Sequence, residues 1–450
     1  MSLSDHPKAY GTAAIAFAFT AGVVATLGFK ELYPELESRY QHKSSGSSSS
    51  SSRRRSADPR RGSFFWGAPV KLEDHDTKAA SSLAAARAAG IATNGIEGCI
   101  GNTPLIEIQS LSRATGRRIL AKAEFLNGAG NSPKDRVALN MILEAEKQGL
   151  LTPHQGDTIY EGTVGSTGIS LATLARAKGY KAHICMPDDQ ALEKSDLLIH
   201  LGATVERVAV APITSPDHFV NLARRRAIEH TRSSDDGSKG FFANQFETES
   251  NWQAHAASTG PEIFQQTGGD LDAFVAGAGT GGTISGVARY LKLEAKMKNL
   301  RVVLADPQGS GLYNKIKHGV MYSPTEKEGT RRRQQVDSMV EGVGINRLTN
   351  NFEIGRDLLD DAVKVTDEQA CRMARWLVEN DGIFVGSSSS VNCVAAVVTA
   401  MELPPGSRVV TLLCDSGTRH LSKFWKHIKE MGLEEGEPTD LFAELGISRS

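Results

Sequence analysis

The sequence predicts an α/β fold built on parallel sheets. From about residue 85 onwards, short apolar runs alternate with segments of helical periodicity, and this alternation is typical of strands joined by crossover helices. Loops rich in glycine, serine and threonine follow several of the apolar runs. With 450 residues, the chain is long enough for one large two-lobed domain, or for roughly two or three ordinary domains.

The expected elements follow one another along the chain. Gly149 and Gly179 each end a helical segment, because glycine accepts the left-handed conformation at a helix end. The charged, turn-rich segment 324–333 is expected to be a surface insertion, and no internal repeat is present. Strands are expected at 119–123, 158–160, 181–186, 273–276, 302–305 and 409–413, and helices at 137–148, 169–178 and 284–292.

The N-terminus predicts a membrane anchor. Residues 9–29 carry no charge, and Lys8 and Lys30 flank them. A helix of this length spans about 30 Å, the thickness of a bilayer core. We expect a retained single transmembrane helix within residues 1–30, although a cleaved signal peptide or a targeting presequence would share part of this pattern.

A low-complexity tether is expected at residues 31–84. It contains the serine run 47–52 and the arginine groups 53–55 and 60–61. Such a composition cannot form a core, so the segment is expected to be disordered. The arginines could contact anionic lipid, but a solvated linker is the simpler interpretation. The folded domain is therefore expected over residues 85–450.

Charge and cysteine content exclude several classes of protein. The net charge is −1, so bulk electrostatics give no case for nucleic-acid binding. An odd number of scattered cysteines without Cys-x-x-Cys spacing argues against a disulfide framework and against structural zinc. No metal site is predicted, and a reducing compartment is expected. The cysteines are Cys99, Cys185, Cys371, Cys393 and Cys414.

Lys134 is the first candidate for chemistry. It lies in the segment 131–136, where a loop of Asn, Ser and Pro turns into a helix. A desolvated lysine can form a Schiff base with an aldehyde cofactor and can later act as a general base. Most lysines are merely solvated surface groups, so this interpretation depends on the remaining motifs.

The glycine-rich run 277–283 predicts a phosphate cradle. It follows an apolar strand and precedes a helix, and unpaired backbone N–H groups at a helix start bind anions. Gly277, Gly279 and Gly282 also satisfy the dinucleotide pattern G-x-G-x-x-G. That fold has an acidic residue about 20 positions further on, whereas the region near residue 300 is a helix end and a strand start without a clean candidate. A tight structural turn is the third alternative. Together with Lys134, the cradle favours pyridoxal 5′-phosphate (PLP).

Two further loops also precede helices. Loop 163–168 offers hydroxyl and N–H groups suited to a substrate carboxylate, although an ordinary helix start would look similar. Loop 386–390 is rich in serine, and a serine hydroxyl can bond a pyridine nitrogen without protonating it. A hydroxyl at the pyridine nitrogen leaves the cofactor ring unprotonated, so the ring is a weaker electron sink. A weaker sink suits elimination at Cβ better than transamination. A simple serine N-cap is the alternative for this loop.

Four ordered motifs resemble cysteine synthase, that is, O-acetylserine sulfhydrylase, in the fold-type II β-family of PLP enzymes. The similarity runs from about residue 96 to about residue 426. The N-terminal anchor and tether resemble those of membrane-bound cysteine synthase-like proteins of fungal mitochondria. The four motifs are Gly101-Asn102-Thr103-Pro104-Leu105, Ser132-Pro133-Lys134-Asp135-Arg136, Gly279-Thr280-Gly281-Gly282-Thr283 and Asp415-Ser416-Gly417-Thr418-Arg419.

The resemblance implies two doubly wound lobes with the cofactor in the cleft between them. The smaller lobe would span about 136–240, and the larger one about 85–135 plus 241–440. Lys134 would hold the cofactor, Ser388 would face its pyridine nitrogen, and segment 342–344 would close over it. The resemblance also implies a homodimer. The remaining cofactor residues would be Ser166, Gly279, Thr280, Gly281, Gly282 and Thr283, and the substrate residues Thr163, Val164, Gly165, Thr167 and Gln245.

The sequence departs from the family in these loops. Val164 replaces a serine, and Ser166 replaces the asparagine that bonds the cofactor's 3′-oxygen in the family. Asn131 and Pro133 stand where glycine and valine are usual, and Ser390 stands where glycine is common. These positions would contact the cofactor or the substrate. The departures therefore affect the assignment of the substrate more than the assignment of the cofactor.

The predicted reaction is β-replacement of O-acetyl-L-serine with sulfide, giving L-cysteine and acetate. Cystathionine β-synthase and serine or threonine dehydratase share the fold, and the short tail beyond residue 417 favours the sulfhydrylase. A catalytically weakened PLP-binding scaffold and a dinucleotide oxidoreductase are alternatives from other classes. The expected location is the mitochondrial outer membrane.

Overall fold

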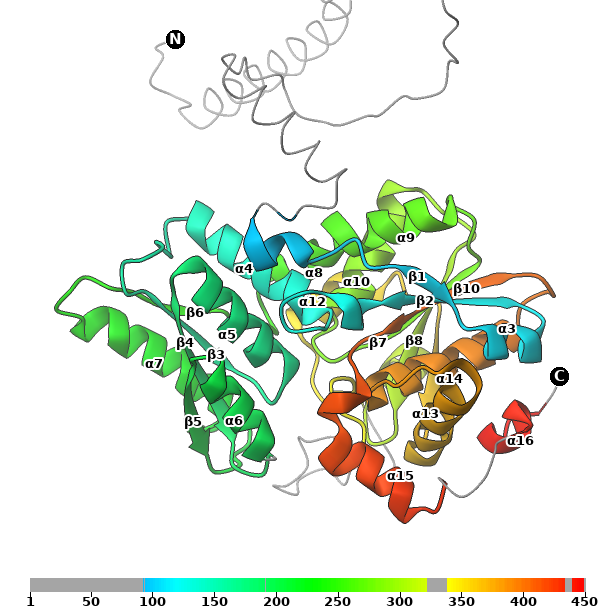
Figure 1. Ribbon diagram of the computed structural model, residues 1–450. Coiled ribbons are helices and arrows are strands. Elements are labelled where there is room, and N and C mark those ends of the chain that lie inside the picture. Colours follow the sequence, from blue (N-terminus) through cyan, green and yellow to red (C-terminus); the bar gives the residue numbers. More distant parts are fainter. Residues whose placement is uncertain (1–91, 93, 191, 322–337, 434–438, 449–450) are drawn as a thin grey trace, which may run out of the picture. The chain divides into compact units, whose positions relative to one another are not determined.

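The computed structural model describes residues 92, 94–190, 192–321, 338–433 and 439–448. It contains a six-stranded sheet of order β1-β2-β10-β7-β8-β9 and a four-stranded sheet of order β5-β4-β3-β6 (Figure 1). The β1–β2 pair is antiparallel, and the other strand pairs of both sheets are parallel. The predicted α/β class with parallel-rich sheets is therefore confirmed.

The strands of the two sheets interleave with helices along the chain. The strands are β1 Leu105–Glu107, β2 Arg118–Ala123, β3 Thr158–Gly162, β4 Lys181–Pro187, β5 Thr204–Val208, β6 Gly240–Phe242, β7 Ala273–Gly277, β8 Arg301–Pro307, β9 Asp361–Val365 and β10 Arg408–Leu413. The helices are α3 Gln109–Thr115, α4 Lys134–Lys147, α5 Ser166–Lys178, α6 Leu192–His200, α7 Phe219–Ser233, α8 Glu249–Ala254, α9 Gly260–Thr267, α10 Gly282–Arg289, α11 Leu312–His318, α12 Asn350–Arg356, α13 Asp367–Asp381, α14 Ser387–Met401, α15 Lys426–Glu430 and α16 Leu441–Leu445.

Each expected strand lies within an observed one, but three expected helices begin too late. Helix α4 begins at Lys134, α5 at Ser166 and α10 at Gly282, two or three residues before the predicted starts. Their first turns are polar or glycine-rich, so apolar periodicity does not detect them. Helix α10 also ends at Arg289 and continues as a π-helical turn over Tyr290–Glu294, where the sequence predicted an uninterrupted helix.

Several predictions fall on residues that the structure does not describe. They are the anchor within 1–30, the tether 31–84 and the surface insertion 324–333. Across the described ranges, no helix combines the length and the apolar character needed to cross a bilayer.

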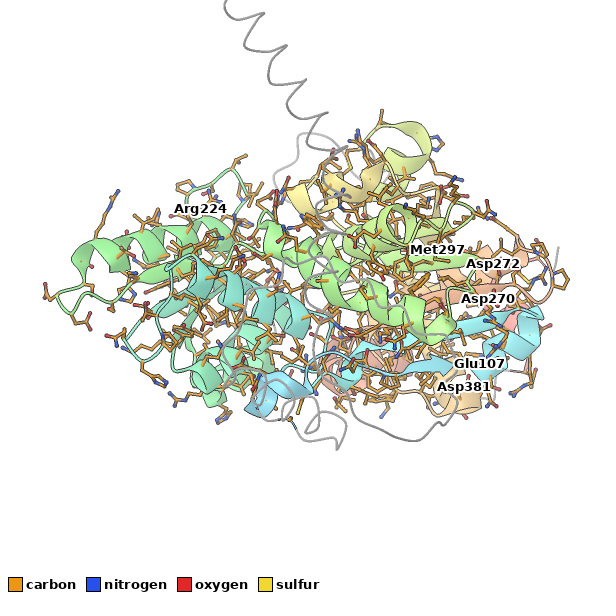
Figure 2. The ribbon with its side chains drawn as sticks, turned by 90° about the horizontal axis from the view of Figure 1, so that it is seen from above. Glu107, Arg224, Asp270, Asp272, Met297 and Asp381 are labelled. Atoms are coloured by element: carbon orange, nitrogen blue, oxygen red, sulfur yellow. The ribbon has the colours of Figure 1, made fainter. Side chains whose placement is uncertain are left out.

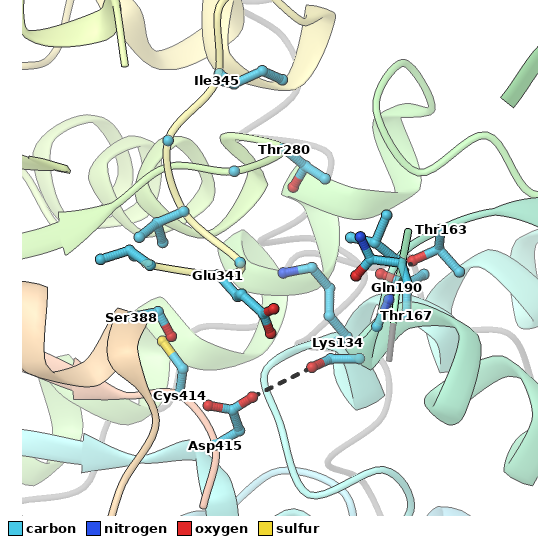
Figure 3. Close-up of a pocket in the computed structure, with 18 of the residues that line it drawn as sticks. Lys134, Thr163, Thr167, Gln190, Thr280, Glu341, Ile345, Ser388, Cys414 and Asp415 are labelled. Carbon is cyan, nitrogen blue, oxygen red and sulfur yellow. Dashed lines mark hydrogen bonds between the residues drawn. The ribbon is translucent and has the colours of Figure 1, made fainter. Parts of the chain in front are cut away.

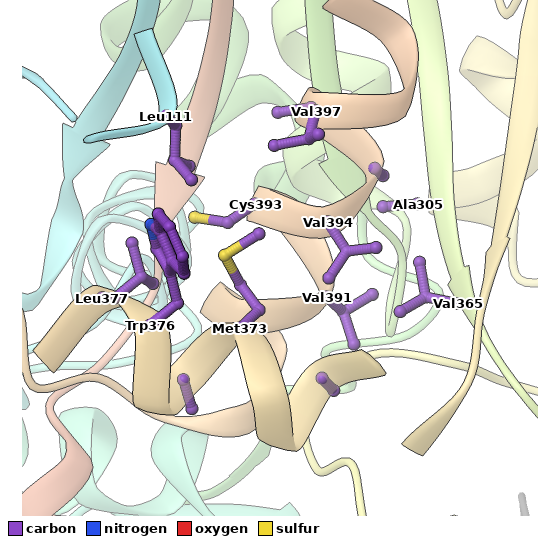
Figure 4. Close-up of a cluster of buried hydrophobic side chains, with 14 of the residues drawn as sticks. Leu111, Ala305, Val365, Met373, Trp376, Leu377, Val391, Cys393, Val394 and Val397 are labelled. Carbon is purple, nitrogen blue, oxygen red and sulfur yellow. The ribbon is translucent and has the colours of Figure 1, made fainter. Parts of the chain in front are cut away.

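The six-stranded sheet packs against helices α13 and α14. Figure 4 shows Met373 of α13 on the side of Val394 of α14, and Trp376 and Leu377 of α13 on the side of Leu111 of α3. All five side chains are buried in one apolar cluster, and each such burial stabilises the fold by roughly 1.5–3 kcal/mol. This packing fixes the N-terminus of α14, which carries the serine loop.

The amino-terminal ends of β7 and β10, two central strands of this sheet, are joined by an ion pair and a hydrogen bond. Asp272 accepts a hydrogen bond from Arg408 N at 2.8 Å, and Asp270 pairs with the Arg408 guanidinium at 2.8 Å. Figure 2 shows Asp270 and Asp272 at the opposite end from Arg224, which stands on α7 over the ring of Phe242 at 5.2 Å. The pocket described below lies between these two ends and is lined by residues associated with both sheets.

Helices α4 and α5 pack together on the four-stranded sheet. Val137 and Met141 of α4 and Leu171 of α5 share a buried cluster with Ile159 of β3 and Ile184 of β4. Helix α7 contacts β3, β4 and β6, and its Leu222 and Ala223 pack against Cys185 of β4. The loops before α4 and α5 are therefore attached to a rigid core.

Candidate active site

One pocket of about 1370 Å³ gathers residues from both sheets. Loops that follow β3, β7 and β10 line it, as do the first residues of α4, α5 and α14 (Figure 3). Every site residue predicted from the sequence lies in its lining except Gly282. Gly282 is buried as the first residue of α10, directly after Gly281 of the lining.

Lys134 is the first residue of α4. Pro133 precedes it with φ −60°, the angle that proline imposes and a helix start requires. The side chain extends into the pocket in Figure 3. Within the described part of the chain, the structure contains no hydrogen bond from its amine. Burial lowers the pKa of Lys134, and the neighbouring Cys414 and Asp415 oppose that effect.

The residues after Lys134 hold it in place. Asp135 accepts hydrogen bonds from Gly130 N at 2.7 Å and from Ser170 Oγ of α5 at 2.6 Å. Arg136 forms ion pairs with Glu124 at 2.8 Å and with Glu262 at 2.6 Å. Removing one partner of such a buried pair is strongly destabilising. The start of α4 is therefore fixed both to α5 and to α9.

The glycine loop approaches other backbone segments too closely for a side chain. A Cβ at Gly279 would lie 2.4 Å from the carbonyl oxygen of Gly342, and one at Gly282 would lie 1.9 Å from Asn251 Oδ1. Gly281 has φ +86°, which favours glycine. The loop thus presents backbone N–H groups at the start of α10, as a phosphate site requires.

Two hydroxyls of this loop are oriented by neighbours. Thr280 Oγ1 accepts a hydrogen bond from Asn251 Nδ2 at 3.0 Å, and Thr283 Oγ1 lies 3.1 Å from His255 Nε2. Burial lowers the pKa of His255, and the positive charges of Arg136 and Lys134 lower it further. His255 is therefore neutral, and its hydrogen bond can orient the Thr283 hydroxyl.

Loop 163–168 leads from β3 into α5. Thr167 Oγ1 donates a hydrogen bond to Gln245 Oε1 at 2.6 Å, and Gln245 Nε2 donates to Glu161 Oε1 at 3.3 Å. Burial raises the pKa of Glu161 to about 8, although hydrogen bonds from Gln245 oppose this. Val164 is 39% exposed at the pocket. The sequence indicated Gln245 and Thr167 but not Glu161.

The serine loop begins α14. Ser389 Oγ accepts a hydrogen bond from Cys414 N at 2.8 Å, and Ser387 Oγ accepts one from Glu341 N at 3.0 Å. Ser388 lies beside Cys414 in Figure 3. Burial raises the pKa of the Cys414 thiol to about 11, against a hydrogen bond from Ser388. The thiol is therefore neutral and lies next to the hydroxyl.

Sequence reasoning missed several ionisable pocket residues, and Glu341, Asp415 and His420 are three of them. Asp415 stands in a quoted motif, but nothing assigned it a role. It follows β10, whose carboxyl end faces the pocket, and that topology is the signal that could have identified it. Glu341 and His420 belong to loops without a periodic pattern.

A His–Cys–Glu group lies outside the pocket. His183 and Cys185 of β4 and Glu206 of β5 bring their ligand atoms within 4.8 Å of one another. Both oxygens of Glu206 are bonded by Arg226, at 2.8 and 3.1 Å. Burial raises the pKa of the Cys185 thiol to about 12. An arginine on the carboxylate and a protonated thiol disfavour a cation here.

The pocket residues fit PLP. Lys134 offers an amine free for the aldehyde, the glycine loop offers N–H groups for the phosphate, and Ser388 offers a hydroxyl for the pyridine nitrogen. The close approaches at Gly279 and Gly282 show that the loop is built around bare backbone. No carboxylate replaces Ser388 at the start of α14.

Comparisons with known proteins agree with this chemistry. Residues 96–415 match the family described as "Pyridoxal-phosphate dependent enzyme". The chain is 69% identical to "Cysteine synthase 2" of Neurospora crassa over 99% of both chains. It is 55% identical to "Putative mitochondrial cysteine synthase" of Saccharomyces cerevisiae over 75% of this chain and 85% of that protein.

A solved structure gives the same result for the fold. The crystal structure of O-ureido-L-serine synthase is similar with a TM-score of 0.64 and 30% identity, covering 76% of this chain and 96% of that one. The chain uses pyridoxal phosphate as its cofactor. It therefore belongs to the cysteine synthase family of pyridoxal-phosphate dependent enzymes.

Proposed function

We propose that this enzyme replaces the acetate of O-acetyl-L-serine with sulfide and releases L-cysteine. The observation that carries the proposal is the arrangement of one pocket, where Lys134, the glycine loop and the hydroxyl of Ser388 lie together. A hydroxyl at the start of α14 favours chemistry at Cβ over transamination. The alternative dinucleotide reading of the glycine loop is set aside by the family match over residues 96–415.

We assign the cofactor contacts as follows. Lys134 would carry the cofactor, Ser388 would bond its ring nitrogen, and Ser166 would lie near its 3′-oxygen. When bound, the cofactor would supply an aldehyde for the substrate's amino group and an electron sink that makes the Cα proton more acidic. The phosphate would be held by the loop residues Gly279, Thr280, Gly281, Gly282 and Thr283.

The chain's own groups then position and deprotonate the substrate. Thr163, Gly165 and Thr167 stand at the start of α5, where N–H groups favour a carboxylate. Lys134 Nζ is the base for the Cα proton, since burial lowers its pKa and so makes the neutral amine more available. Acetate leaves from Cβ, and sulfide adds there. A closed pocket favours sulfide over water by excluding bulk solvent.

Val164 and Gln245 complete the proposed substrate loop. Val164 offers no hydrogen bond, so it would shape the pocket by volume. Gln245 directs its Oε1 to Thr167 and its Nε2 to Glu161. In that orientation it would fix the Thr167 hydroxyl, and through it the loop.

A substrate panel tests the proposal. Purified holoenzyme would be given O-acetylserine or L-serine, each with sulfide or homocysteine, and the products would be identified by mass spectrometry. We expect L-cysteine from O-acetylserine and sulfide at the highest rate. Cystathionine as the main product would indicate cystathionine β-synthase, and keto acid with ammonia would indicate a dehydratase. No product from any pair, with cofactor bound, would support the weakened scaffold.

We also propose a mitochondrial, membrane-anchored location. The uncharged stretch 9–29 supports an anchor, and a Saccharomyces cerevisiae relative is named as mitochondrial. The anchor would occupy 1–30, the tether 31–84 and the catalytic domain 85–450, with a homodimer by analogy to the family. Carbonate extraction of isolated mitochondria tests the anchor. The full chain should stay in the membrane pellet, and a variant lacking residues 1–30 should be released.

A further inference from the structure

His420 lies between two carboxylates at the edge of the pocket. Its Nε2 is 3.1 Å from Asp415 Oδ2, and its Nδ1 is 3.8 Å from Glu341 Oε2. The side chain is only 6% exposed. A neutral imidazole carries a proton on one nitrogen only, whereas the imidazolium carries one on each. Carboxylates facing both ring nitrogens therefore match the charged form.

Both carboxylates also accept hydrogen bonds from helices that accompany the four-stranded sheet. Asp415 Oδ2 accepts a hydrogen bond from Ser166 Oγ, the first residue of α5, at 3.5 Å, and Figure 3 marks this contact at Asp415. Glu341 Oε2 accepts one from Lys194 Nζ of α6 at 2.9 Å. His420 therefore lies between two carboxylates, each of which makes its own contact across the pocket.

The backbone makes room for this arrangement at Gly386. A Cβ there would lie 2.4 Å from His420 Nε2 and 2.5 Å from Asp415 Oδ1. The Gly386 N–H also donates to the Asp415 carbonyl at 3.1 Å. Gly386 is the N-cap of α14, two residues before Ser388. The histidine and its aspartate therefore pack directly against the start of the serine loop.

The surrounding charges favour a protonated His420. Burial alone would lower its pKa, but the hydrogen bond and charge of Asp415 and the charge of Glu341 raise it above the ordinary value, while Lys194 opposes them. The pKa values of both carboxyls are lowered despite their burial. The other charged groups near the two carboxylates are Lys134 and Arg419 beside Asp415 and Lys423 beside Glu341, at 3.5 Å.

We propose that His420 is a positioning residue, whose imidazolium holds Asp415 and Glu341 so that Ser166 and Lys194 keep the substrate loop and α6 against the pocket. Its predicted effect on substrate binding rests on the proposed function. A group with a raised pKa contributes fully below its ordinary pKa, and the contribution is lost as pH rises through the raised value. The KM for O-acetylserine should therefore rise at alkaline pH, while kcat changes less.

The experiment compares His420→Gln with His427→Gln in the full-length holoenzyme. His427 is in the same C-terminal segment, and its imidazole pairs with the exposed residue Glu430 at 3.9 Å. KM and kcat for O-acetylserine would be measured from about pH 6 to about pH 9, a range that brackets the histidine titration. We expect the wild type and His427→Gln to show a KM that rises about fivefold with pH, as for a partly buried ion pair.

His420→Gln should have the raised KM at every pH, with kcat within about twofold of the wild type and the visible cofactor absorbance retained. A pH profile identical to that of the wild type would overturn the proposal. If His420→Gln does not fold, Glu341→Gln removes the second carboxylate and keeps the imidazole. It should shift the KM step to lower pH, and an unchanged step would also overturn the proposal.

Failure of the proposed function would be recognised separately. A wild-type enzyme that turns over no O-acetylserine at any pH would refute that function but leave His420 testable. Binding of L-cysteine, followed by the absorbance of the bound cofactor, gives the same comparison without turnover. Loss of its pH dependence in His420→Gln alone would support the positioning role, and equal pH dependence in all three proteins would refute it.

Discussion

At the scale of single residues, Lys134 and Glu161 show how burial changes an ionisable group. The sequence indicated Lys134 because a glycine- and serine-containing loop precedes it and a phosphate cradle follows elsewhere. Nothing indicated Glu161, because an acidic residue on a short strand reads as a solvent-facing position. The structure instead buries it completely under Gln245. A pattern of residue types does not reveal which polar group the packing encloses.

Lys134→Ala should abolish the lysine-bound absorbance of the cofactor and lower kcat by about a thousandfold or more, because it removes both the covalent attachment and the base. Lys147→Ala is the matched control, since Lys147 is on the same helix with its side chain 78% exposed. Absorbance spectra and steady-state rates of both variants check this. A Lys134→Ala enzyme with a normal spectrum and rate would show that another residue holds the cofactor and acts as the base.

Glu161 should make stability fall as pH rises. Burial raises its pKa to about 8 in the folded protein, from an ordinary value of 4.5, so the folded state binds the extra proton. Between these values the unfolded state loses its proton first and becomes relatively more stable, by up to about 5 kcal/mol. Urea unfolding at about pH 5 and about pH 8 measures the difference.

Glu161→Gln should reduce that pH dependence, because an amide does not titrate. Glu249→Gln replaces an exposed glutamate at the start of α8 and should leave the dependence unchanged. Equal slopes for Glu161→Gln and the wild type would mean that Glu161 is already ionised in the folded protein.

At the scale of elements, six of the ten strands in the described residues were predicted close to their observed bounds, and the helix starts were not. Apolar runs identified β2, β3, β4, β7, β8 and β10, whose residues are largely buried. The edge strands β1, β5 and β9 are only partly buried, so their sequences carry a weaker apolar signal. The starts of α4, α5 and α10 are polar because they face the pocket, and this hides them from periodicity.

The glycine loop before α10 gives a prediction at this scale. Gly281→Ala should weaken PLP binding by tenfold or more, about 1.4 kcal/mol, because a Cβ there would lie 2.6 Å from Phe352 Cα. Gly116→Ala is the matched control, since Gly116 also has positive φ (+68°) but has open space around its Cβ position. Cofactor affinity is measured by reconstituting the apoenzyme at increasing PLP concentrations.

If both glycine variants lost affinity equally, backbone strain rather than close approach would be the cause. If neither lost affinity, the loop would not bind the phosphate.

At the scale of the whole molecule, the site exists only where the two sheets meet. The sequence could name Lys134, the glycine loop and Ser388, because each stands in a local motif. It could not place Glu341 beside Asp415 and His420, because Glu341 belongs to a loop far along the chain from the other two. Only the packed halves bring Ser166 and Lys194 to these carboxylates.

The most direct test of the central claim is an absorbance titration of the full-length holoenzyme with O-acetylserine, followed by sulfide. The account predicts that the visible band of the lysine-bound cofactor shifts when O-acetylserine is added and returns when sulfide is added, with one L-cysteine formed per site. A band that O-acetylserine leaves unchanged, in an enzyme that carries its cofactor, would contradict the proposed substrate.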